Sequence, residues 1–260
     1  YWTGYKAEDW FDNPRRIKRA RKLLERIVAN ATAVSVVNPA IAEYLGAGEV
    51  IYNSYDPERA KLWRCPTAAD KLQIGILGTL DELRPVEPLF KLLATMRENA
   101  PAVFEKISLC QIGAINIAEF DTLVDRYGLR DRITVHGTLG RIETIERLSE
   151  CAMLYIGLST SKETDIIPGR IFDMIASGRT LLAYAPPDSM IADLVNETNN
   201  GHCFHADNMS SAVEYLLSRY QFFSEGKLAV KPLPDYACKF SAEGMAGQFA
   251  GLIEKVSGVN

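Results

Sequence analysis

The sequence predicts an α/β protein whose main domain is a Rossmann-like parallel sheet with helices on both faces. Between residues 72 and 225, short apolar segments alternate with helical segments of about ten residues, which is typical of βαβ units. The composition, 47% hydrophobic and 24% charged, provides enough apolar side chains to bury a core. Parallel strands joined by helices form a sheet that is covered on both sides.

The elements of this domain follow in order from the apolar runs and the glycines and prolines that end them. Strands are expected at 72–78, 107–113, 132–137, 152–158, 180–184 and 201–206. Helices are expected at 86–99, 118–128, 142–151, after Pro168, at 189–195 and at 210–220.

The segments on either side of this domain have a different organisation. Helix 13–31, strand 32–37, helix 39–46 and strand 50–56 resemble the end of a preceding α/β domain. We therefore assign residues 1–63 to the remnant of an N-terminal domain, 64–71 to a linker, 72–225 to the main domain and 226–260 to an extension with a final helix. Because the first residue is Tyr1 and not Met, we expect the natural N-terminus to lie upstream.

Charge and cysteine content exclude several classes of protein. The formal net charge of -4 provides no overall field for a nucleic-acid partner. The sequence has neither a signal peptide nor an apolar run approaching the roughly 20 residues that span a bilayer. The five cysteines are scattered, without CxxC spacing, which fits a reducing cytoplasm.

Open parallel sheets bind ligands beside the carboxyl ends of their strands. The four loops expected there span 78–84, 113–116, 136–140 and 159–169. The first has neither a Gly-x-Gly-x-x-Gly fingerprint nor a Walker loop, which disfavours a nicotinamide dinucleotide. It places Arg84 just before a helix that Pro85 is expected to start. A solvated loop arginine is the favoured interpretation of Arg84 from the loop alone.

The segment "PGRIFD", residues 168–173, has the residue types of an anion site. The first turn of a helix attracts phosphate, Gly169 permits close backbone approach, and Arg170 adds a charge. Asp173 is one turn further and has a carboxylate suited to a ribose diol. The alternative, an Arg170–Asp173 surface pair, is equally supported by the residues themselves.

Other polar candidates are weaker. Cys203, His205 and Asp207 are expected on one face of a strand and suggest a metal site, but an ordinary late strand is the preferred interpretation. His136 follows a strand and either contacts the ligand or is structural. We expect Tyr155 and Phe172 in the core. Hydrolase motifs are absent from the sequence.

The order of these segments resembles the C-terminal half of GT-B-fold nucleotide-sugar glycosyltransferases, the group 1 type. "VIYNSYD" resembles their interdomain "v-i-p-N-G-v-D", and "IGILGTLDELRPVEPLFKLL" resembles "G-R-l-x-x-x-K-G-x-x-x-L". "ITVHGTLGRIETIERLSECAMLYIGLS" resembles "v-x-f-x-G", a helix and "a-D-v-x-v-x-P-S". "DIIPGRIFDMIASGRTLLA" resembles an acid, seven residues, an acid and "A-x-G-x-P-v-i-A". The resemblance covers roughly residues 30–220.

The resemblance implies roles for the positions that match. Arg84 falls on the lysine that faces the donor diphosphate, and Gly169 and Arg170 fall at the diphosphate-facing helix start. Asp173 falls on the acid that binds the ribose, and Asp165 on the acid that touches the donor sugar. It thus implies Arg84 and Asp165 as catalytic residues. With His136, these residues would form the donor site.

Some positions depart from the family pattern. Thr79 replaces an arginine that contacts the diphosphate, both acids are Asp instead of Glu, and Thr180 replaces a proline. These departures predict weakened or altered donor binding.

The resemblance implies transfer of a sugar from a nucleoside diphosphate to a glycan, lipid-linked or small-molecule acceptor, with retention and without a metal or other cofactor. This chain would be mostly the donor-binding domain. The alternatives are a nucleotide-sugar epimerase of the same fold and a non-catalytic nucleotide-binding domain. The basic face of helix residues 15–26 is expected to be solvated, with peripheral attachment to the inner face of a membrane as the alternative.

Overall fold

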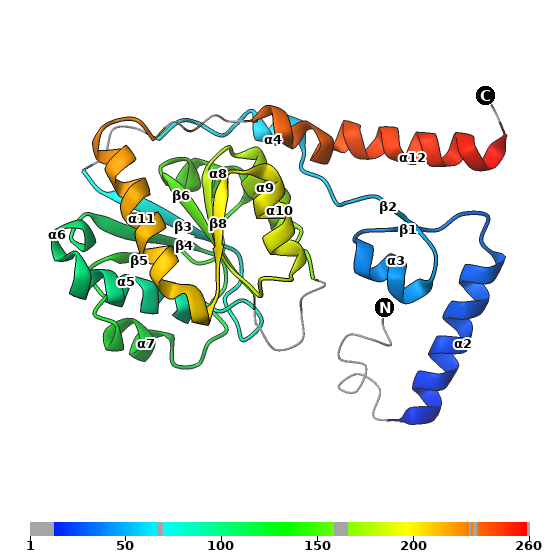
Figure 1. The fold of residues 1–260 in the computed structure, drawn as a ribbon, viewed down its shortest axis with the longest axis horizontal. Helices are drawn as coiled ribbons and strands as arrows, with labels where there is room; N and C mark the ends of the chain where they lie inside the picture. The colour runs from blue at the N-terminus through cyan, green and yellow to red at the C-terminus, as the bar shows by residue number, and fades with distance from the viewer. Residues whose placement is uncertain (1–12, 67–69, 159–165, 229, 231–232, 259–260) are drawn as a thin grey trace. The chain divides into compact units, whose positions relative to one another are not determined.

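A computed structural model describes residues 13–66, 70–158, 166–228, 230 and 233–258 (Figure 1). The chain forms two compact units. The first comprises Tyr1–Ser54 and Ala242–Asn260, and the second comprises Tyr55–Ser241.

The second unit contains a six-stranded, entirely parallel sheet. Its strands are β3 (Leu72–Leu77), β4 (Ile107–Ile112), β5 (Ile133–Val135), β6 (Met153–Gly157), β7 (Thr180–Tyr184) and β8 (Gly201–Phe204). Their order across the sheet is β5-β4-β3-β6-β7-β8. This order reverses between β3 and β6, as in a doubly wound nucleotide-binding fold. The predicted fold class is confirmed.

Helices cover both faces of this sheet (Figure 1). One face carries α5 (Glu87–Asn99), α7 (Phe120–Arg126) and α11 (Met209–Ser224), whose apolar residues share a core with β3 and β4. The other face carries α8 (Arg141–Ser149), α9 (Arg170–Ala176) and α10 (Met190–Thr198). Each helix buries one apolar stripe against the sheet. The burial of this apolar surface is the largest favourable contribution to the free energy of folding. Tyr155 and Phe172 are fully buried, as predicted.

A buried arginine joins the loops at the end of the sheet where β6 and β7 begin. Arg179 is 0% exposed, and its guanidinium donates to the carbonyl oxygens of Ser149 and Cys151, each at 2.8 Å. It also donates to the Ser177 and Arg64 carbonyls and lies 4.7 Å from the Trp63 ring. These bonds satisfy carbonyl groups at the end of α8 that have no partner within the helix.

The first unit contains α2 (Pro14–Asn30), α3 (Pro39–Leu45) and α12 (Ala242–Ser257). Asn13 and Asn38 cap the first two helices by accepting hydrogen bonds from backbone N–H groups. Its strands β1 (Ser35–Val36) and β2 (Glu49–Val50) are parallel partners of only two residues each.

The predicted strands 32–37 and 50–56 are therefore wrong in extent. Beyond Val50 the chain turns toward α4 (Pro57–Ala60), whose first turn is capped by the Asp56 carboxylate accepting from the Glu58 N–H. Pairing ends after Ile51, whose N–H donates to Val36 O at 2.8 Å, because the chain leaves β1 at Asn38, which caps α3.

Two further boundaries and two elements also differ from the prediction. Strand β8 ends at Phe204, because His205 caps the 3₁₀ turn η1 (Ala206–Asn208). Pro85 does not start α5, which begins at Glu87. The short helix α6 (Pro101–Phe104) and the 3₁₀ helix η2 (Asp235–Phe240) were not predicted.

The helices in the described part of the chain are too short or too polar to cross a membrane.

Candidate functional site

The switch point between β3 and β6 brings together the segments that follow these two strands. Strand β3 continues into Gly78, and after β6 the chain reaches α9 at Arg170. Strand β6 pairs with β3 only at Ile74–Ile76 of β3, so the two strands are no longer paired beyond Ile76. A doubly wound sheet binds its ligand at such a point.

Arg170 lies against Gly78 at this point. A Cβ atom added to Gly78 would be 2.6 Å from Arg170 Nη1, so a side chain at position 78 would displace the guanidinium from its present place. Gly78 also has φ +96°, a conformation that side chains rarely adopt. The absence of a side chain at Gly78 therefore places the guanidinium directly on the end of β3.

No hydrogen bond or ion pair joins the Arg170 side chain to a described residue. Its Nε atom is buried without a hydrogen-bond partner. Burial, followed by the nearby charge of Arg84, lowers the pKa of Arg170 to about 10, although the nearby charge of Asp81 acts to raise it. The ion pair between Arg170 and Asp173, which was the alternative interpretation of these residues, is not formed within the described chain. A half-buried guanidinium in this state favours an anionic ligand.

Arg84 is held by an ion pair with Asp81 in the loop after β3. The Asp81 carboxylate accepts from Arg84 Nε at 3.1 Å and from the Leu83 and Arg84 backbone N–H groups. Burial alone would raise the pKa of Asp81, but its hydrogen bonds with Arg84 and the charge of Arg84 outweigh burial and lower it. The Arg84 side chain is 34% exposed, so it is neither freely solvated nor fully enclosed.

Asp173 is half-buried on the first turn of α9. Burial raises the pKa of its carboxyl, although the charges of Arg59 and Arg141 act to lower it. The sequence prediction did not include these two arginines, because they come from α4 and the start of α8. Their proximity arises only in the folded chain.

The remaining predicted residues are placed differently. His136 follows β5, an edge strand two positions from β3, and its backbone N–H donates to the backbone carbonyl of Gln111 at 2.9 Å. Gly169 has φ −54°, and an added Cβ would meet no atom within 4 Å, so no protein contact requires glycine there. Asp165 lies outside the described residues. The structure therefore brings Arg84 and Arg170 together, with Asp173 on the same short helix as Arg170.

Gln111 is a polar residue of this region that the sequence analysis missed. It is 0% exposed on β4, and its Nε2 atom donates to the Gly78 carbonyl at 3.2 Å. The segment "ISLCQIG" has the pattern of an ordinary buried strand, and the only available signal was one amide within an apolar run.

The metal candidate is not assembled as a site. Cys203 Sγ faces the Ala185 carbonyl at 3.9 Å, while His205 Nδ1 accepts from the Asp207 N–H as a cap. In the part of the chain that the structure describes, no group of three or more His, Cys, Asp or Glu side chains is placed to hold a metal ion.

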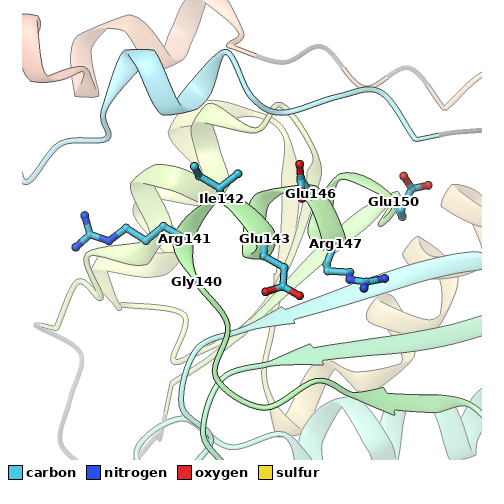
Figure 2. A pocket seen from close by; sticks show the side chains of 7 residues that line it. All are labelled: Gly140, Arg141, Ile142, Glu143, Glu146, Arg147 and Glu150. Atoms are coloured by element: carbon cyan, nitrogen blue, oxygen red, sulfur yellow. The ribbon is translucent and has the colours of Figure 1, made fainter.

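Two surface pockets flank this region. Figure 2 shows one along α8, whose lining contains none of the predicted site residues; it consists of Gly140, Arg141, Ile142, Glu143, Glu146, Arg147 and Glu150. The other is formed by the loops after β3 and β4, with Asp81, Pro85 and Asn116 in its lining. The α8 pocket is lined by two arginines and three glutamates and contains neither Arg84 nor Arg170.

Comparison with solved structures identifies the fold. Sucrose-phosphate synthase from Thermosynechococcus elongatus superposes with a TM-score of 0.68 at 17% identity, over 91% of this chain and 61% of that one. HepE from Anabaena, in complex with UDP-glucose, superposes with a TM-score of 0.69 at 14% identity, over 94% and 69%. WaaG, a glycosyltransferase involved in lipopolysaccharide biosynthesis, gives 0.62 at 11% identity, over 86% and 62%.

The chain has the GT-B fold. The sequence itself matches no family model and no curated protein. At these identities the likeness establishes the GT-B fold alone. The chain spans between 61% and 69% of the lengths of these three GT-B neighbours. The six-stranded second unit is a Rossmann-like domain of the kind that GT-B proteins contain.

Proposed function

We propose that this chain is mostly the donor-binding part of a GT-B glycosyltransferase, which transfers a sugar from a nucleoside diphosphate to an acceptor. The observation that carries the proposal is Arg170, a half-buried cation at the switch point whose Nε has no acceptor in the described chain. The acceptor would be a glycan, a lipid-linked sugar or a small molecule, and it would meet the donor in the complete protein.

The charges near Arg170 suit a diphosphate. The lowered pKa of Arg170 has two causes, burial and the positive charge of Arg84, and a dianionic ligand would relieve both. The ligand would also compete with Asp81 for Arg84, whose guanidinium is partly exposed. Two arginines can neutralise a diphosphate, so we propose that donor binding needs no divalent metal.

The same groups would assist the reaction. As the bond between the sugar C1 and the diphosphate oxygen breaks, the bonding electrons go to the diphosphate and an acceptor oxygen bonds to C1. The acceptor hydroxyl proton passes to a base. Arg84 and Arg170 would stabilise the negative charge that grows on the leaving diphosphate, which is a large term in such catalysis.

The remaining residues would orient the donor. We propose that Asp173 accepts hydrogen bonds from the ribose hydroxyls, because its carboxylate is half-buried on the turn that begins with Arg170. Gly169 has open space beside its Cα and would allow the diphosphate to approach. As the family resemblance implies, His136 would contact the nucleotide and Asp165 would contact the donor sugar. Transfer would retain the configuration at the sugar C1.

A thermal-shift screen tests this function. Because HepE, a structural neighbour, was solved with UDP-glucose, uridine diphosphate and its sugars are the first ligands, followed by the other nucleoside diphosphates. Ligands that bind only the folded state raise the melting temperature. We expect a rise with at least one diphosphate and none with the matching nucleoside. If the whole set leaves the melting temperature unchanged, the proposed function is wrong.

The two alternative functions give different products. An epimerase would return an epimerised nucleotide sugar without an acceptor, and a non-catalytic domain would return the donor unchanged even in the complete protein. Analysis of products from the complete protein with donor and acceptor separates all three.

A further inference from the structure

The carbonyl of Gly78 is bonded by a side chain and not by the neighbouring strand. The pairing of β3 with β4 continues past the strand ends, since Gly78 N donates to Ile112 O at 2.7 Å and Leu80 N to Ala114 O at 2.9 Å. Between these bonds, the Gly78 carbonyl accepts from Gln111 Nε2 at 3.2 Å. Gln111 is therefore the group that holds the carbonyl of the peptide joining Gly78 and Thr79, between these two backbone bonds.

This bond comes at a cost within the core. Gln111 is 0% exposed, and its Oε1 atom is buried without a partner. An unpaired buried oxygen is unfavourable, and the neighbouring positions on β4 are occupied by Cys110 and Ile112. The bond to Gly78 is the only one that any described residue makes with the Gln111 side chain.

The orientation of this peptide leaves one donor free. All peptide bonds here are trans, so the Thr79 N–H points in the direction opposite to the Gly78 carbonyl, away from Gln111. The Thr79 N–H has no acceptor in the described part of the chain, and β6 no longer pairs with β3 beyond Ile76. The Arg170 guanidinium lies against the preceding residue, Gly78, where a Cβ atom would otherwise be.

Two donors without acceptors thus occur on adjacent parts of the switch point. Arg170 Nε and the Thr79 N–H both lack a partner among the described residues. Backbone N–H groups bind phosphate oxygens well and need no side-chain charge. Thr79 occupies the position where the resembled motif has arginine, so a backbone donor there would replace a side-chain donor.

We propose that Gln111 is a positioning residue for diphosphate binding, because it fixes the Gly78–Thr79 peptide so that the Thr79 N–H donates to the diphosphate beside Arg170. This inference rests on the proposed function and adds the group that does the work of the missing arginine. Gln111 itself does not touch the ligand.

The test is an NMR titration of the ¹⁵N-labelled chain with inorganic pyrophosphate, a probe that does not depend on the base or the sugar. In the unmodified chain we expect the Thr79 amide proton to move downfield at saturation. Gln111→Met keeps the side-chain volume but removes the donor, and should raise the Kd for pyrophosphate roughly tenfold, the effect of one charge-assisted hydrogen bond. The Thr79 shift should then be lost.

Gln73→Met is the matched control. Gln73 lies on β3 toward the opposite end of the same sheet, where its Oε1 accepts from Cys151 Sγ at 3.4 Å. This variant makes the same substitution away from the switch point, so its Kd and its Thr79 shift should equal those of the unmodified chain. An equal loss in both variants would show a general packing effect and overturn the role of Gln111.

A second variant keeps the inference testable if Gln111→Met does not fold. Gln111→Glu has no donor when ionised but regains an O–H donor when protonated. Its Kd, expressed relative to that of the unmodified chain, should improve as the pH falls through the pKa of the new carboxyl. A pH-independent ratio would contradict the inference.

The outcomes separate the two proposals. Failure of the unmodified chain to bind pyrophosphate would contradict the proposed function. Binding without a Thr79 shift, or with an unchanged Kd in Gln111→Met, would overturn the inference about Gln111 and leave the proposed function standing.

Discussion

Arg170 and Arg179 belong to the same unit and have opposite environments. Burial lowers the pKa of both to about 10. Arg179 donates to four backbone carbonyl groups, whereas Arg170 has no acceptor among the described residues. Arg179 stabilises the fold through these bonds, whereas we propose that Arg170 binds a ligand.

Methionine substitutions should separate these roles. Arg179→Met leaves buried carbonyls without donors and should lower the free energy of unfolding by about 2–4 kcal/mol, with diphosphate affinity unchanged in the folded protein. Arg170→Met removes a poorly solvated charge, so we expect a change within about 1 kcal/mol in stability and at least a roughly tenfold loss of affinity. Urea unfolding and calorimetric titration measure both quantities. A large destabilisation by Arg170→Met would make it a structural residue.

Asp173 should make stability depend on pH. Its folded-state pKa is raised by burial, so the folded state favours the protonated carboxyl. This contribution is fully present below the unfolded-state pKa and is lost as the pH rises through the folded-state pKa. Relative to Asp173→Asn, the unmodified chain should therefore gain stability as the pH falls through the range just above 3.8. A difference in unfolding free energy that stays constant with pH would contradict this account.

The same residue should contribute to affinity. Asp173→Ala is expected to weaken nucleoside-diphosphate binding by about 1–3 kcal/mol, the effect of losing hydrogen bonds to a charged group. Pyrophosphate has no ribose and serves as the control ligand, whose affinity should change much less. If both ligands lose affinity equally, Asp173 is not a ribose ligand.

Sequence reasoning named some of the residues from which the proposed site is built. Arg84, Arg170 and Asp173 were predicted because charged residues followed strand ends at spacings that a motif also has. Gln111, Arg59 and Arg141 were not predicted, because their roles depend on long-range contacts. Because Thr79 replaces an arginine of the resembled motif, the sequence predicted a missing diphosphate contact there. It did not predict that the Thr79 backbone N–H could serve as a donor, because a free backbone N–H cannot be recognised from a sequence.

At the scale of elements, predictability followed the strength of the apolar pattern. Strand β7 matches its predicted bounds. Each of β3, β4 and β6 differs from its predicted length by at most two residues, because the interiors of these strands are buried on both faces. The two-residue strands β1 and β2 were overextended. Strand β1 ends because Asn38 caps α3 directly after it, and β2 then has no further partner with which to pair.

Helix α2 provides a prediction at this scale. Its basic residues are mostly exposed and none of its residues is buried; these basic residues are Arg15, Arg16, Lys18, Arg19, Arg21, Lys22 and Arg26. Leu23 and Ile27 are also 57% exposed. We expect the basic face to be solvated, so the chain should not cosediment with anionic vesicles at physiological salt. Salt-sensitive cosedimentation, lost when the arginines are replaced by glutamine, would establish membrane contact instead.

At the scale of the whole molecule, the chain covers only part of its structural neighbours. It spans 61% of the sucrose-phosphate synthase chain and 69% of HepE. The residues proposed to bind the donor all lie in the second unit, Tyr55–Ser241. A glycosyltransferase must also orient an acceptor against the donor and exclude water from the reacting atoms.

We therefore expect this chain to bind a nucleotide without transferring sugar. Its best-binding nucleotide sugar should be incubated with added acceptors, with transfer and slow donor hydrolysis both followed by chromatography. We predict no transfer product. Efficient turnover would show that the catalytic machinery is contained in these residues.

The central claim is that Arg170 and Arg84 form a diphosphate site that needs no metal. The most direct measurement is calorimetric titration of a nucleoside diphosphate, chosen by the thermal-shift screen, into the unmodified chain and Arg170→Met, in chelator and in magnesium. The account predicts equal affinities for the unmodified chain in both buffers and at least a roughly tenfold weaker affinity for Arg170→Met. Binding that requires magnesium, or that is unaffected by Arg170→Met, would contradict it.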